Sequence, residues 1–136
     1  MSDGLVVASS RLSFAETLER LCAALERNGV EIFARIDHAA NAATAGLGLR
    51  PTTVLVFGAA KAGTPLMAAR QTLGLDLPLR ALVFEDAEGE TRVAYNDPAW
   101  IVSRQGLDAA AFPSVAGMAK LLAAVTAEAA GAPAGG

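Results

Sequence analysis

The segment FGAAKAGTPLM, residues 57–67, has the residue types of an anion-binding corner. An apolar run ends in a glycine, and Thr64 followed by Pro65 predicts a helix start, with the threonine as cap. The first N–H groups and the dipole of a helix attract a carboxylate or phosphate, and Lys61 adds a full positive charge. Helix capping explains Thr64 and Pro65 without any ligand, and a tight turn explains Gly63 in the same way. Lys61 is therefore the residue that most favours a site.

Lys61 and Thr64 do not form a nucleotide-binding P-loop. That motif needs lysine directly before the hydroxyl residue that holds Mg²⁺, whereas Ala62 and Gly63 intervene here. ATP hydrolysis by this route is not expected. Serine catalysis is not expected either, because no serine lies in the G-x-S-x-G pattern of a nucleophile elbow.

The only histidine, His38, directly follows Asp37 at the end of a predicted strand. Asp37 could orient the imidazole as a proton shuttle or metal ligand, or both residues could make ordinary loop hydrogen bonds. One histidine and one cysteine give no repeated metal-ligand spacing. The sequence therefore predicts no metal site and implies no cofactor.

Further polar residues bracket a predicted hairpin. Glu85 and Asp86 point to opposite faces of an alternating strand, so a carboxylate pair for acid–base chemistry is not implied. Asp97 is explained as a helix cap, which leaves Tyr95 and Asn96 unexplained. No catalytic residue is assigned. The candidate ligand-binding residues are His38, Lys61, Gly63, Thr64, Asp86, Tyr95 and Asn96.

The elements that position these residues are expected in the order β-α-β-β-α-β-β-α. Apolar runs and alternation predict strands over 5–9, 30–37, 52–58, 79–86 and 90–96. The run 52–58 is expected to be the central strand of the sheet, with both faces covered. Because the last two strands form a hairpin, we expect an α+β fold: a mainly antiparallel sheet with helices packed on one side.

Capping patterns place the helices. Ser13 with Glu16 has the S-x-x-E capping pattern of a helix that carries Cys22 on its apolar stripe, which predicts a packed thiol. Ser114 is expected to cap a final amphipathic helix. Residues 1–127 are predicted to form a single domain, and residues 128–136 a disordered tail with little to bury.

Bulk composition excludes several classes of protein. The net charge of −3 comes without a basic block, so no nucleic-acid partner is expected. No segment approaches the roughly 20 apolar residues that span a bilayer, and the N-terminus lacks the pattern of a signal peptide. A single cysteine cannot form an internal disulfide. We expect a soluble, cytoplasmic protein without a membrane partner.

The chain resembles the prokaryotic family known as domain of unknown function 302 over about residues 5–125. The motifs that carry the resemblance are Asp37-His38, Leu49-Arg50-Pro51-Thr52, Phe57-Gly58, Lys61, Gly63-Thr64-Pro65, Asp76-Leu77-Pro78-Leu79, Glu85-Asp86 and Tyr95-Asn96. The resemblance implies an antiparallel sheet packed by helices, related to the TATA-binding-protein-like topology, and a homodimer. It implies no activity, and fold similarity to a DNA-binding protein is no evidence of DNA binding.

Two departures from the family pattern bear on function. Ala59 and Ala60 stand where the family usually has Asn-Pro, and Gln105 stands where it usually has histidine. If a family site uses that amide and that imidazole, this chain lacks both. Catalysis and metal binding are less expected as a result.

Three hypotheses follow for function. The first is a dimeric binding domain with a pocket lined by the candidate residues. In this pocket, Lys61 and nearby backbone amides would face an anionic small molecule. The second is an enzyme with His38 as general base and Lys61 as electrostatic stabiliser. The third is a purely structural dimerisation module, which would require an exposed apolar face.

Overall fold

Five strands form one antiparallel sheet in the computed structural model, which describes residues 4–132. The order across the sheet is β1-β5-β4-β3-β2, and every neighbouring pair is antiparallel. The predicted α+β class is confirmed. The strands are β1 (Leu5–Ser9), β2 (Glu31–Asp37), β3 (Thr52–Gly58), β4 (Leu79–Glu85) and β5 (Thr91–Asn96).

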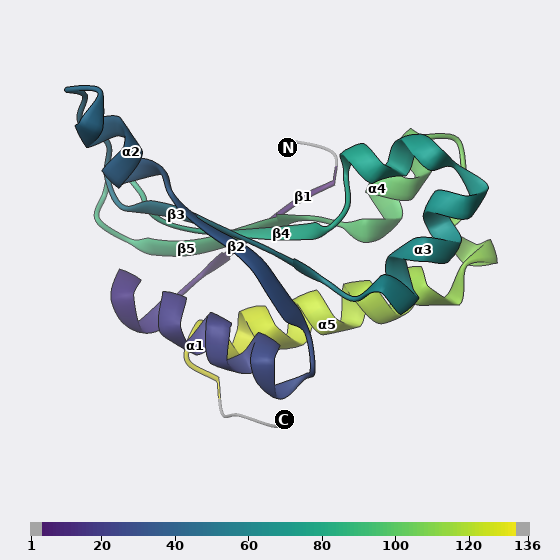
Figure 1. The fold of residues 1–136 in the computed structure, drawn as a ribbon. Coiled ribbons are helices and arrows are strands. Elements are labelled where there is room, and N and C mark those ends of the chain that lie inside the picture. Colours follow the sequence, from purple (N-terminus) through teal and green to yellow (C-terminus); the bar gives the residue numbers. More distant parts are fainter. Residues whose placement is uncertain (1–3, 133–136) are drawn as a thin grey trace.

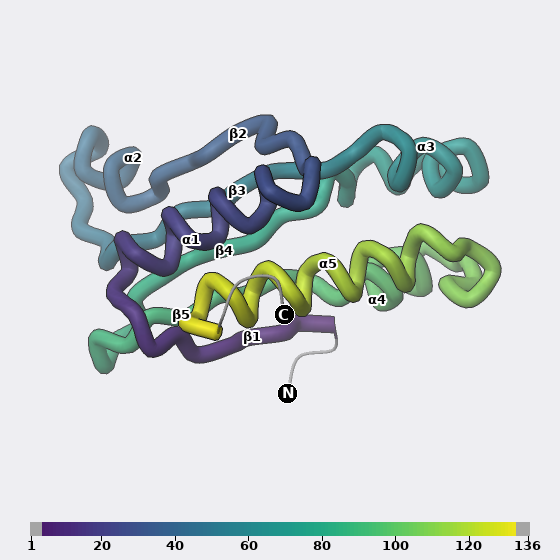
Figure 2. The backbone as a smooth tube through the Cα atoms, turned by 90° about the horizontal axis from the view of Figure 1, so that it is seen from below, coloured from purple at the N-terminus to yellow at the C-terminus, as the bar shows by residue number. Residues whose placement is uncertain are grey.

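The two longest helices lie side by side across one face of the sheet (Figures 1 and 2). These are α1 (Phe14–Arg27) and α5 (Pro113–Ala129). The shorter elements α2 (His38–Thr44), α3 (Ala60–Ala69) and α4 (Pro98–Arg104) lie toward the ends of the sheet, with 3-10 turns η1 (Gln71–Leu75) and η2 (Ala109–Ala111). The prediction that helices pack on one side of the sheet is confirmed for α1 and α5.

The inner face of the sheet, toward α1 and α5, holds the core. Leu55, Phe57, Val83 and Val93 are fully buried there, because alternate residues of a strand point to the same face. The apolar stripe of α1 packs against them as predicted. Burial of Cys22 on that stripe raises its thiol pKa, and the nearby Arg35 guanidinium lowers it by less. The thiol is packed rather than activated.

The outer face carries an apolar row that crosses all five strands. Strand register aligns its members, which are Val7, Ala94, Leu82, Val54 and Ile36. At its two ends Val7 is 47% exposed and Ile36 is 37% exposed. The prediction that both faces of 52–58 are covered holds only for the inner face: Leu55 and Phe57 are fully buried, whereas Val54 and Val56 on the outer face are half-buried. The strand is interior, but β4 is the central one.

Two helix starts differ from the prediction. The α3 helix begins at Ala60, so Thr64 is not its cap and Pro65 lies inside it. Because alanine and lysine are strong helix formers, the helix extends about one turn upstream of the proline. The last helix begins at Pro113 rather than after a Ser114 cap. The capping interactions predicted at Ser13 and Asp97 are confirmed, with bonds to the N–H groups of Glu16 and Ala99 respectively.

The C-terminal part is ordered further than predicted. The α5 helix runs to Ala129, whose side chain is fully buried. Arg20 donates to the carbonyls of Glu128 and Ala132, and Arg11 donates to that of Gly131. The predicted disordered tail is therefore wrong for residues 128–132, while 133–136 lie outside the described residues. Within 4–132 no helix is both long and apolar enough to cross a membrane.

Candidate functional site

The predicted site residues lie at two opposite ends of the sheet. His38 and Asp86 follow the ends of β2 and β4, where Asp37 pairs with Thr53 and Glu85 pairs with Thr91. The remaining residues, Lys61, Gly63, Thr64, Tyr95 and Asn96, lie toward the other end, where β3 and β5 finish. The seven residues therefore do not line one pocket.

The separation between His38 and Lys61 follows from the register of β3. Gly58 lies five residues beyond Thr53, the partner of Asp37. At a rise of about 3.4 Å per residue, this places the two ends of the strand roughly 17 Å apart. General-base catalysis requires hydrogen-bond reach or one bridging water. His38 and Lys61 cannot act on the same reacting atoms in this arrangement.

Asp37 is used as a helix cap. Its Oδ1 accepts a hydrogen bond from the N–H of Ala40 at 2.9 Å, at the start of α2. His38 is the first residue of that helix and is exposed. Within residues 4–132 no cluster of three or more histidine, cysteine or carboxylate side chains could hold a metal ion.

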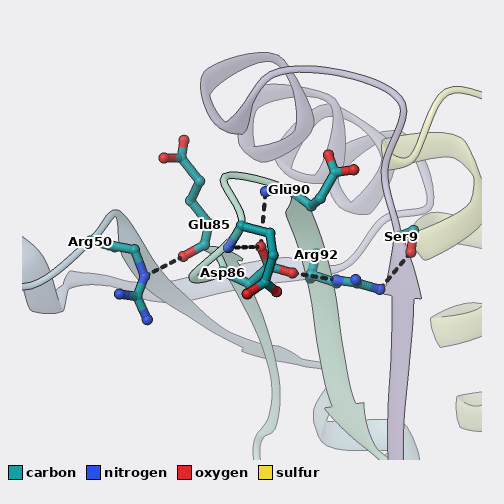
Figure 3. A network of polar contacts seen from close by, with 7 residues as sticks. Ser9, Arg50, Glu85, Asp86, Glu90 and Arg92 are labelled. Carbon is teal, nitrogen blue, oxygen red and sulfur yellow. Dashed lines mark hydrogen bonds and ion pairs between the residues drawn. The ribbon is translucent and has the colours of Figure 1, made fainter.

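Asp86 organises the turn between β4 and β5 (Figure 3). Its Oδ1 accepts from the N–H groups of Glu88 and Glu90, at 3.0 and 2.9 Å. Its Oδ2 accepts from Arg92 Nε at 2.9 Å, and Arg92 also donates to Ser9 Oγ. The bond from Glu90 and then that from Arg92 lower the pKa of the carboxyl group. These contacts explain Asp86 without a ligand.

Tyr95 and Asn96 point to opposite faces of β5. Tyr95 pairs with Val6 and Ala81 and packs against the core, and burial, followed by the charge of Asp97, raises its pKa. Asn96 is exposed on the other face. Neither residue lines the pocket described next.

An apolar pocket of about 360 Å³ lies where β3 leads into α3. Its floor is buried and its rim is exposed. The floor includes Phe57, Gly63, Leu79 and Met118, and the rim consists of Phe33, Ala59, Ala60, Thr64 and Pro78; Val30, Gly58, Ala62, Met67, Leu77 and Leu121 complete the lining. Pockets of this size and apolar character are typical of small-molecule sites.

Small residues create the hollow. Gly58, Ala59, Ala60 and Gly63 surround the junction of β3 and α3, where larger side chains would fill the space. A β-carbon on Gly63 would lie 3.6 Å from both Leu77 and Met67. The alanines that depart from the family pattern therefore contribute to the shape and the apolar character of this pocket.

Lys61 lies beside the pocket rather than in it. It is exposed in the first turn of α3, between the lining residues Ala60 and Ala62. A helix turns about 100° per residue, so Lys61 neighbours the rim residue Thr64 one turn later. Ala59, at the cap position, offers no side chain to the first N–H groups of the helix. A cation and backbone donors thus border an apolar cavity.

Sequence reasoning missed most of the pocket. Only Gly63 and Thr64 of the seven candidates line it. One signal was available: Phe33 breaks the alternation of its strand, and it lies at a β-bulge between Ile32 and Ala34. Met67 and Met118 gave no signal distinct from ordinary core residues.

Comparison with known proteins gives one family and one fold. Residues 5–128 match the family model described as "Domain of unknown function DUF302". A crystal structure of an uncharacterised conserved DUF302 protein from Bacillus stearothermophilus has a TM-score of 0.82 and 20% identity, covering 94% of this chain and 99% of that one. At this identity the likeness shows the fold.

Curated relatives carry the name of an ion channel. The "Fluoride-specific ion channel FluC 1" of Brucella suis is 44% identical over 131 residues, which is 96% of this chain and 52% of the relative. "Fluoride-specific ion channel FluC 2" of Brucella melitensis is also 44% identical, with 48% of its length covered. The chain thus spans about half the length of the curated relatives it matches.

Proposed function

The chain belongs to the DUF302 family, and we propose that it is a binding domain for a small amphipathic molecule. The observation that carries the proposal is the apolar pocket of about 360 Å³ at the start of α3. The ligand's apolar body would occupy the pocket, and an anionic group such as a carboxylate would lie at the rim beside Lys61.

The lining supports an apolar body. Among its side chains only the hydroxyl of Thr64 is polar, so the pocket offers little to a ligand that needs many hydrogen bonds. Two methionines, Met67 and Met118, give the walls adaptable side chains that fit irregular apolar shapes. A highly charged metabolite would lose its hydration here without compensation.

The first turn of α3 supports an anionic head group. Lys61 supplies a full charge, and the helix dipole and first N–H groups add to it at the same rim. An octanoate ion has both required parts, an apolar chain and a carboxylate, whereas octanol keeps the chain without the charge.

Calorimetric titration with octanoate and octanol tests both parts. We expect both to bind with saturation, and Lys61→Ala to weaken octanoate by about two- to fivefold, as for an exposed ion pair, while octanol is unaffected. Lys120→Ala is the matched control, because Lys120 is exposed on α5 and does not line the pocket. Absence of saturable binding by either probe would contradict the proposal.

A homodimer that pairs two outer faces is the partner we propose. The supporting observation is the apolar row through Leu82, whose ends Val7 and Ile36 are partly exposed. Covering such a row with a second copy would remove apolar surface from water. Leu82→Lys should lower the sedimentation-derived mass to that of a monomer, while Ala116→Lys, at an exposed position of α5, should not. A mass unaffected by Leu82→Lys would reject this face.

Association with a fluoride channel is a second candidate function, favoured by the 44% identity to the Brucella relatives over 96% of this chain. The residues of this chain would then act together with a fluoride channel. Removing the matching half of the Brucella suis relative should alter fluoride efflux from cells, and supplying this chain separately should restore it. Unchanged efflux after the removal would argue against this function.

A further inference from the structure

Phe33 owes its position to a β-bulge. The register of β2 against β3 shifts between Ile32, which pairs with Phe57, and Ala34, which pairs with Val56. Phe33 is therefore an extra residue that the pairing skips, and a bulge of this kind turns a side chain away from regular alternation. Here the side chain lies against the pocket.

The Phe33 ring lies where the pocket meets solvent. It lines the pocket and is nevertheless 51% exposed. Gly58 lies next to the ring: a β-carbon there would be 3.9 Å from Phe33 Cε2 and 3.4 Å from Pro78 Cβ. The ring, the glycine and the proline thus form one side of the opening.

The other rim residues cannot cover the opening. Ala59, Ala60 and Thr64 are small, and the ring of Pro78 is fixed to the backbone. Of the exposed residues that line this pocket, Phe33 alone has a large side chain with free χ1 and χ2 rotation. Half of its surface still faces water, so it can gain contacts when an apolar molecule enters.

We propose that Phe33 closes over the bound molecule and acts as a specificity-determining residue, favouring ligands whose apolar body reaches the rim. The proposal rests on the proposed function of the pocket and adds to it a named selecting residue. Packing of the ring on the ligand slows its escape, because the contact must break before dissociation. The selected class is then an amphipathic acid long enough to touch the ring.

The test is the dissociation rate of a fluorescent amphipathic anion. 1-Anilinonaphthalene-8-sulfonate is bound to the protein and displaced by excess octanoate in a stopped-flow instrument, which restricts the signal to the shared site. Loss of one aromatic contact should make dissociation from Phe33→Ala about three- to tenfold faster. Phe33→Leu, which keeps a large apolar side chain, should show a smaller increase.

Leu75→Ala is the matched control. Leu75 is 83% exposed and does not line the pocket, so its loss tests for dye held on other apolar surface. Thermal unfolding of each variant identifies any that do not fold, in which case the comparison between the wild type and Phe33→Leu decides.

The outcomes separate the two proposals. If the wild type binds neither the dye nor octanoate with saturation, the pocket function fails and this inference with it. If the wild type binds both and dissociation from folded Phe33→Ala matches the wild type, the pocket function stands and the role of Phe33 is rejected; where Phe33→Ala does not fold, a match between Phe33→Leu and the wild type rejects it. Equal acceleration by Leu75→Ala would also reject it.

Discussion

Asp86 joins three parts of the chain through its carboxylate. It accepts bonds from the N–H groups of Glu88 and Glu90, and its ion pair with Arg92 leads to Ser9 on β1 (Figure 3). Arg50 also donates to the Glu85 carbonyl beside it. A side chain that the sequence suggested for ligand binding is thus committed to the hairpin turn.

The charge of Asp86 should make part of the stability depend on pH. Its pKa is lowered in the folded state from the usual value of 3.8, so the ionised form stabilises the fold above that value, and this contribution is lost as the pH falls through the lower, folded-state pKa. Asp86→Asn should unfold at lower urea concentration than the wild type at neutral pH. The difference should shrink in acid.

Glu88→Gln is the control for that comparison. It removes a carboxylate from the same turn but keeps the backbone N–H that bonds to Asp86. Urea unfolding curves at neutral and acid pH should show little change for this variant. A pH dependence equal to that of Asp86→Asn would assign the effect to the general charge of the turn.

At the residue scale, side-chain type predicted the local hydrogen bonds of helix caps, but it did not predict where residues lie relative to one another in the fold. Asp97 and Ser13 were predictable because a cap bonds within its own helix turn. The position of His38 relative to Lys61 depends on strand pairing, which local sequence does not determine. Antiparallel neighbours run in opposite directions, so residues that follow β2 and β3 lie at opposite ends.

At the scale of elements, α3 is a weakened helix beside a cavity. Pro65 has no N–H to donate to the carbonyl of Lys61, and Gly63 lowers helix propensity. The pair Thr64-Pro65 is typical of a helix start, because a cap residue and a proline often occur together there. The structure places that pair in the second turn, since the preceding Ala-Lys-Ala run is itself strongly helical.

Gly63→Ala should stabilise the protein by about 0.5–1 kcal/mol, because alanine loses less backbone entropy on forming a helix. Its methyl group would meet Leu77 and Met67 at 3.6 Å, an ordinary contact. Gly117→Ala in α5 is the matched control, where a β-carbon meets nothing within 4 Å. Thermal unfolding should show similar gains for both, and only Gly63→Ala should reduce octanoate binding. A loss of stability specific to Gly63→Ala would mean that the pocket wall cannot accept a methyl group.

Arg20, on α1, forms hydrogen bonds to the end of α5. Its guanidinium donates to the Glu128 and Ala132 carbonyls at 2.9 and 2.8 Å. Arg20→Lys cannot reproduce this fork, so amide hydrogen exchange at 129–132 should become faster. Arg104→Lys, which alters a contact to Asp76 away from α5, should leave those amides unchanged. Equal exchange rates in wild type and Arg20→Lys would show that the other contacts of this segment, among them the hydrogen bond from Arg11 to the Gly131 carbonyl, hold it without the Arg20 fork.

For the whole molecule, the two faces of the sheet should differ in whether they tolerate a charged side chain. Leu55 on the inner face is fully buried, whereas its neighbour Val54 belongs to the outer apolar row. An unpaired charge in the core costs far more than one that can reach water. We therefore expect Leu55→Lys to abolish the native circular dichroism spectrum and Val54→Lys to retain it. Unfolding of both variants would mean that the outer face also behaves as core.

The overall fold was largely predictable, and the pocket was not. Alternation and turn residues give the hairpin of β4 and β5 and the other strands, because these signals are local. The pocket joins residues from four distant segments, around Phe33, Phe57–Met67, Leu77–Leu79 and Met118–Leu121. Nothing local to any one of them specifies that their small and apolar side chains leave a hollow.

The pairing of β1 with β5 has a consequence for synthesis. Leu5–Ser9 hydrogen-bonds only to Thr91–Asn96 among the strands of the sheet, with Ser9 opposite Arg92. A ribosome that adds roughly 5–20 residues per second needs several seconds to make the intervening chain. During that interval β1, with its valines, has no native partner. Chaperones that shield nascent apolar segments would find a target there.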